Sequence, residues 1–124
     1  MARTFGDFDN VNLLTGNKNW IFGMVSLPIG ATGAPGTTTG LPGFTFTRST
    51  NGTYTVVCPS GVDAVIFPFV RLSAALTVID CVVTAQSATA GTFTVKSLNA
   101  AGAATDPASG DILGFFIMAK ATAI

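Results

Sequence analysis

The chain has 124 residues, enough for one domain with a hydrophobic core of its own. Charged residues make up only 10% of it, where about 25% is usual, and six cations balance six aspartates. Such sparse, balanced charge argues against the basic patches of nucleic-acid-binding proteins and membrane-surface helices, and the absence of histidine argues against ordinary acid–base catalysis.

Residues 1–18 predict an N-terminal arm. The segment mixes apolar side chains with Gly, Asp and Asn and follows neither a helical nor a strand period. An extended arm that docks its apolar residues elsewhere and a disordered tail are both compatible with this pattern. The first residues contain no apolar stretch typical of a secretory signal, so we expect synthesis in a cytoplasm without export by a signal. The arm residues of interest are Phe5, Phe8, Leu13 and Leu14.

The next segment predicts one strand, a long loop and a hairpin. Trp20–Leu27 is a strand-like run, and residues 30–43 consist almost wholly of Gly, Pro, Ala and Thr, which predicts a long exposed loop. Phe44–Thr47 and Thr53–Cys58 both alternate, and the Asn51-Gly52 pair between them is the strongest short hairpin signal. The alternation of the second strand places Tyr54, Val56 and Cys58 on one face.

Four further strands are predicted in the second half of the chain. Pro68 interrupts the first of them, which predicts an edge strand or a bulge there. Loops are expected at residues 86–91 and 99–111. The four strands are Val62–Val70, Leu76–Thr84, Thr92–Leu98 with Phe93 and Val95 inward, and Ile112–Lys120.

This pattern predicts an all-β fold of about seven to eight strands, arranged as a β-sandwich or jelly roll. We expect a single sandwich domain over residues 19–124, preceded by the arm at residues 1–18. The two cysteines, Cys58 and Cys81, lie in apolar runs and are expected to be buried thiols, although the sequence also allows them to face each other across a sheet.

Two strands are apolar on both faces, which points to an assembly surface. A strand that covers a core on one side is normally polar on the other, yet Leu76–Thr84 and Ile112–Met118 are not. Either a neighbouring subunit or the arm covers the second face, or both are central strands capped by loops. Besides the four arm residues, the predicted interface comprises Leu76, Val78, Val82, Leu113, Phe115 and Ile117.

No catalytic, cofactor or metal site is expected. The cysteines have no histidine to activate them. The carboxylates of Asp7 and Asp9 resemble a calcium loop only weakly, and the run from Asp106 to Asp111 is more typical of a turn. Trp20 and Tyr54 could form a sugar platform, but their place in alternating strands favours the core. The sequence thus indicates a binding or structural protein and not an enzyme.

Residues 44–120 resemble the β-sandwich domains of bacteriophage virion proteins, both capsid decoration proteins and tail-fibre domains. The resemblance lies in the run 51–56, the run Gly91–Val95 with the following turn at 100–107, and the last strand, Ile112–Met118. It implies a homotrimer that acts by binding surfaces, and it brings no catalytic residues.

We therefore expect a capsid decoration, or cement, protein on the surface of a phage head. Its partners would be other copies of itself, as a homotrimer, and the major capsid protein, with no nucleic acid and no membrane. A receptor- or carbohydrate-binding module of a tail fibre is the first alternative, although the loops contain few of the aromatic and polar residues such sites use. Another capsid or tail-tube subunit is the second.

Overall fold

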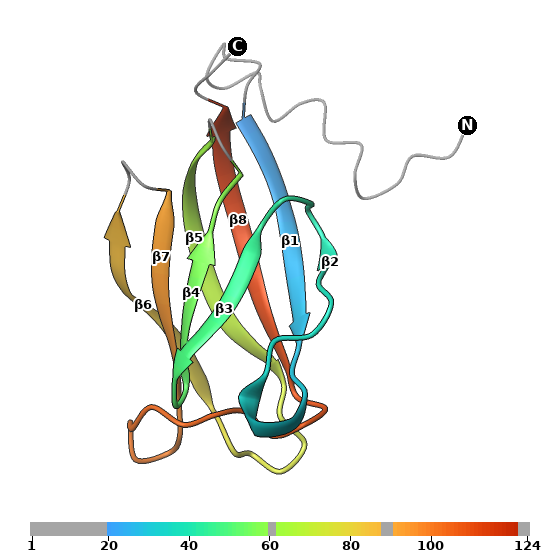
Figure 1. Ribbon diagram of the computed structural model, residues 1–124, viewed down its shortest axis with the longest axis vertical. Helices are drawn as coiled ribbons and strands as arrows, with labels where there is room; N and C mark the ends of the chain where they lie inside the picture. The colour runs from blue at the N-terminus through green and yellow to red at the C-terminus, as the bar shows by residue number, and fades with distance from the viewer. Residues whose placement is uncertain (1–19, 60–61, 88–90, 122–124) are drawn as a thin grey trace, which may run out of the picture.

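A computed structural model describes residues 20–59, 62–87 and 91–121. Two antiparallel sheets form a β-sandwich, which confirms the predicted all-β class (Figure 1). One sheet has the strand order β2-β1-β8-β5 and the other β3-β4-β7-β6. The predicted arm lies outside the described residues. The elements are β1 (Trp20–Pro28), η2 (Ala31–Gly33), β2 (Thr39–Gly40), β3 (Thr45–Thr50), β4 (Thr53–Val57), β5 (Val62–Leu72), β6 (Asp80–Ser87), β7 (Thr92–Leu98) and β8 (Ile112–Ala121).

The core lies between the sheets and follows the strand alternation. Each strand turns every second side chain inward, so β1, β5 and β8 face β4, β6 and β7 across an apolar layer. The ring of Phe115 on β8 lies 4.8 Å, centroid to centroid, from the ring of Phe46 on β3. The inward set includes Val25, Leu27, Tyr54, Val56, Ile66, Cys81, Phe93, Val95, Leu113, Phe115 and Ile117.

Several local predictions are confirmed. The Asn51-Gly52 turn joins β3 to β4 as an antiparallel hairpin, and Tyr54, Val56 and Cys58 are buried together. Strand β5 is an edge strand, as Pro68 predicts, and its register shifts between Val70 and Leu72. Cys58 and Cys81 are buried thiols and not half-cystines.

The strand predicted at Leu76–Thr84 is wrong in its bounds, because β6 begins at Asp80 and continues to Ser87. The amide of Leu76 donates to the carbonyl of Ser73, which closes a turn, and Leu76 has a φ of +56°. A β-branched, apolar sequence favours a strand here, but Leu76 belongs to the turn that follows β5, and the register with β7 begins only at Asp80. The loop predicted over residues 86–91 is wrong at its first two residues, because Gln86 and Ser87 belong to β6.

The segment predicted as an exposed loop, residues 30–43, contains the 3-10 turn η2 and the short strand β2. β2 pairs with β1, where Val25 lies opposite Gly40. The carbonyl of Gly33 accepts a 2.7 Å hydrogen bond from the buried hydroxyl of Tyr54. The segment is therefore attached to both sheets.

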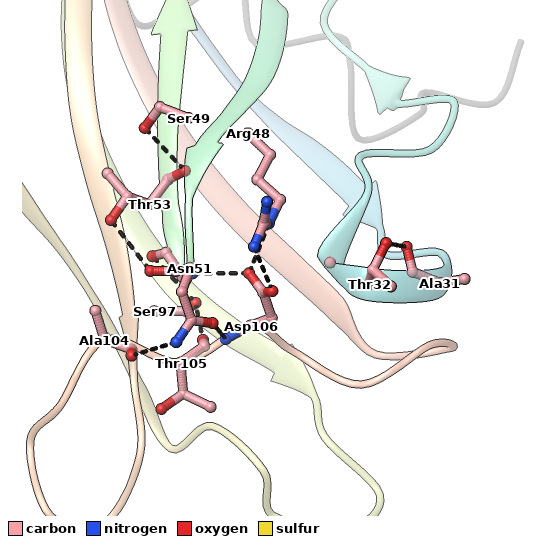
Figure 2. Close-up of polar contacts among 12 residues, drawn as sticks. Ala31, Thr32, Arg48, Ser49, Asn51, Thr53, Ser97, Ala104, Thr105 and Asp106 are labelled. Atoms are coloured by element: carbon pink, nitrogen blue, oxygen red, sulfur yellow. Dashed lines mark hydrogen bonds and ion pairs between the residues drawn. The ribbon is translucent and has the colours of Figure 1, made fainter.

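One end of the sandwich is held by a polar cluster around Asp106, which Figure 2 shows beside the β3–β4 hairpin. Its carboxylate accepts two hydrogen bonds from the Arg48 guanidinium, at 2.9 and 2.8 Å, and a third, at 2.7 Å, from the amide of Gly52. The amide of Asp106 donates in turn to the side-chain oxygen of Asn51. These contacts attach the 99–111 loop to a hairpin more than 50 residues away.

We expect Asp106→Asn to lower the free energy of unfolding by about 1 kcal/mol at pH 7. The hydrogen bonds from Arg48, with a smaller contribution from the Gly52 amide, hold the pKa of Asp106 below its ordinary value. A depressed carboxyl pKa adds stability above the unfolded-state pKa, and this stability is lost as the pH falls through the folded-state pKa. Urea unfolding should therefore show the variant and the wild type converging below about pH 4. Arg48→Gln should lose the larger share of this pH-dependent part, because the Gly52 amide still donates to Asp106. A constant difference between Asp106→Asn and the wild type down to low pH would contradict the prediction.

No helix in the described part of the chain has the length and apolar character to cross a lipid bilayer.

Candidate assembly surface

The outer faces of the two sheets differ in chemistry. The β3-β4-β7-β6 sheet turns mainly threonines outward, and Thr47, Thr55 and Thr94 lie in line across β3, β4 and β7. Threonine suits a solvated strand face, because it combines high β-propensity with a hydroxyl group. This face is the polar side expected of an antiparallel sheet that meets water.

The β2-β1-β8-β5 sheet turns an apolar surface outward. Among the described residues, nine large apolar side chains are exposed, and six of them lie on this one face. Their exposed fractions range from 36% for Phe22 to 51% for Phe67. We call this surface the aromatic face; it consists of Phe22, Met24, Val65, Phe67, Leu72 and Phe116.

Strand register gathers these side chains into one patch. Phe116 on the central strand β8 lies opposite Met24 on β1 and Phe67 on β5. Its ring centroid is 6.4 Å from that of Phe22 and 6.3 Å from that of Phe67, both in tilted arrangements. The three rings therefore form a continuous row across the sheet, within the range of favourable aromatic contact.

A glycine and a phenylalanine shape the surface beyond this row. Gly114 on β8 lies opposite Phe69 on β5, and a Cβ atom at Gly114 would lie 2.3 Å from the tip of the Phe69 ring. The absence of a side chain at Gly114 lets the tip of the Phe69 ring approach the backbone of β8.

Arg71 lies at the end of the aromatic face where β5 ends. Arg71 donates from Nη1 to the Ser26 hydroxyl on β1, at 2.7 Å, and so reaches across β8 from β5. Arg71 is exposed and forms no ion pair with any described residue. Arginine and aromatic residues are the types enriched at the centres of protein–protein interfaces.

The predicted interface residues fall into three groups. Phe5, Phe8, Leu13 and Leu14 lie outside the described residues. Leu113, Phe115 and Ile117 are fully buried against the opposite sheet, so the chain covers that face of β8 itself. Of the remaining three, Val78 is buried, Val82 is half-buried, and Leu76 is 72% exposed on the loop before β6. The open face of β8 is therefore the one that carries Phe116.

Sequence reasoning missed most of the aromatic face. Phe22, Met24, Val65, Phe67 and Phe116 were each assigned to a strand but not to its outer side. Their own alternation contained the signal, since β1 and β5 are apolar at outward as well as inward positions. Only pairing with β8 shows that these outward positions meet on one surface.

The described residues offer little else that could perform chemistry. Burial raises the pKa of the Cys81 thiol to about 12, which keeps it protonated and unreactive at neutral pH. The described residues contain no group of three or more His, Cys, Asp or Glu able to hold a metal ion. Asp111 accepts hydrogen bonds from the Ala108 amide and the Ser73 hydroxyl, so it supports a turn.

Comparison of the chain with protein-family models, curated proteins and solved structures finds no match.

Proposed function

We propose that this chain is a structural subunit that works by attaching to copies of itself and to a larger protein shell, as a capsid decoration protein of a bacteriophage does. The aromatic face carries this proposal. A water-exposed row of phenylalanine rings gives no benefit to a free monomer, but it stabilises a complex when a partner covers it. Burial contributes about 25 cal/mol for each Å² of apolar surface removed from water.

The rest of the surface supports attachment over catalysis. The chain has no net charge and few charged groups, so copies do not repel one another strongly. A capsid repeats the same joint between subunits many times. A weak contact made at every joint would therefore add up to a large stabilisation of the shell. The proposed assembly is a homotrimer on the outside of the capsid, with the major capsid protein as its second partner.

Co-sedimentation with capsids that lack the chain tests this function. We expect the wild-type protein to pellet with capsids assembled from the major capsid protein, and Phe67→Thr to pellet at least tenfold more weakly. Val57→Thr is the matched control, because Val57 is exposed on the opposite sheet and should not affect binding. Wild-type protein that stays in the supernatant with intact capsids would contradict the proposal.

A further inference from the structure

The loop between β5 and β6, together with the first residue of β6, presents a second exposed surface, which we call the loop knob. It consists of Leu76, Ile79 and Asp80. Leu76 is 72% exposed and Ile79 is 54% exposed. Asp80 is also exposed; its Oδ1 accepts a hydrogen bond from the Cys81 amide, and it forms no ion pair with any described residue.

The fold does not explain the leucine at position 76. Its φ of +56° is a left-handed conformation that glycine and asparagine adopt at much lower cost. Its side chain is mostly in water, so burial within the chain does not compensate for this cost. A strained, exposed apolar residue of this kind points to a contact outside the chain.

The loop that carries this residue is well anchored. The Ser73 carbonyl accepts from the Leu76 amide, and the Ser73 hydroxyl donates to Asp111. Val78 is 1% exposed, and the Ile79 amide donates to the carbonyl of Leu98 at 2.8 Å. The knob is therefore presented in a defined conformation, which limits the entropy lost on binding.

The knob and the aromatic face complement each other in charge as well as in apolar character. Arg71, a cation, lies at one end of the aromatic face. The knob carries a carboxylate, Asp80, beside two apolar residues. A knob docked at that end would supply the Arg71 guanidinium with a carboxylate partner.

We propose that the loop knob of one copy docks on the aromatic face of the next, with Asp80 paired to Arg71 of the neighbouring copy. This inference names the self-contact within the proposed function. Each copy contributes its loop knob to one neighbour and its aromatic face to another. The contact is therefore head-to-tail and can close into a ring. A homotrimer is such a ring.

Charge-reversal variants test the contact. Their self-association is measured by sedimentation velocity over a concentration series. Arg71→Asp and Asp80→Arg should each weaken self-association at least tenfold, because each places like charges in contact. The double variant carrying both substitutions restores opposite charges and should recover most of the wild-type association. Lys96→Asp, a charge reversal on the outer face of the other sheet, should leave association unchanged. A monomeric wild type, or a double variant as dissociated as the single ones, would overturn the proposal.

Leu76→Gly provides a second readout that a purely structural role would not produce. Glycine removes the left-handed strain, so we expect the melting temperature of the dissociated protein to rise by about 3–6 °C. The same variant should self-associate at least tenfold more weakly, because the knob loses its most exposed apolar side chain. Unchanged association would contradict the docking of Leu76.

The inference and the proposed function fail in different ways. Rings that form through this contact but do not pellet with capsids would overturn the decoration role and leave the contact intact. Monomers that pellet with capsids would overturn the head-to-tail contact alone.

Discussion

Phe116→Asp should lower self-association and capsid binding by at least about a hundredfold while the chain still folds. Phe116 stands at the centre of the aromatic face, with the Phe22 and Phe67 rings on either side. A bound partner would bury this position, so the substitution removes an apolar contact of about 1.5–3 kcal/mol and places an unpaired carboxylate in the interface. The side chain is 42% exposed in the single chain, so folding requires no comparable burial of the charge.

The matched control for this variant is Val57→Asp. Val57 is 37% exposed on the outer face of the other sheet, so the same charge is added at similar exposure. We measure self-association by light scattering and capsid binding by co-sedimentation. For Val57→Asp we expect both to stay within about twofold of wild type. Equal losses in both variants would mean that added charge, and not the aromatic face, determines the result.

Gly52→Ala should lower the free energy of unfolding by about 3–5 kcal/mol. Gly52 has a φ of +64°, and a Cβ atom there would lie 2.4 Å from the backbone nitrogen of Thr105. The amide of Gly52 also donates to Asp106, so a shift that relieves the overlap breaks the polar cluster. Backbone atoms of a paired loop cannot move aside as the tip of a flexible side chain can.

Gly102→Ala separates the backbone strain at Gly52 from the overlap of a Cβ atom with Thr105. Gly102 has a φ of +80°, but no atom lies within 4 Å of the position its Cβ would take. The control therefore carries the conformational strain alone, which we expect to cost about 1 kcal/mol in urea unfolding. Equal losses at the two positions would show that the close approach of Gly52 to Thr105 does not limit stability.

Local patterns predicted the fold class and most strands. The Asn51-Gly52 turn, the alternation around Tyr54 and the proline in β5 are each signals confined to a few residues, and each is confirmed. The start of β6 could not be found in the same way, because the turn at Leu76 depends on hydrogen bonds to Ser73 in an otherwise strand-like sequence.

The candidate surface was only half predictable, for a physical reason. The doubly apolar pattern of β8 indicated that one face needs a partner, but it did not indicate which face the chain itself covers. That choice depends on the packing of Leu113, Phe115 and Ile117 against the opposite sheet. The contacts of Arg71 with Ser26 and of Arg48 with Asp106 join residues 45 and 58 positions apart, and no local pattern encodes such pairs.

The molar mass of the wild-type protein in solution tests assembly through the aromatic face most directly. We would measure it by light scattering on a sizing column, alongside Phe116→Asp. We predict a discrete wild-type species of three times the 12.6 kDa chain mass, and a variant that elutes as a single chain. A wild-type protein that stays at 12.6 kDa over the whole accessible concentration range would show that the aromatic face does not hold copies together.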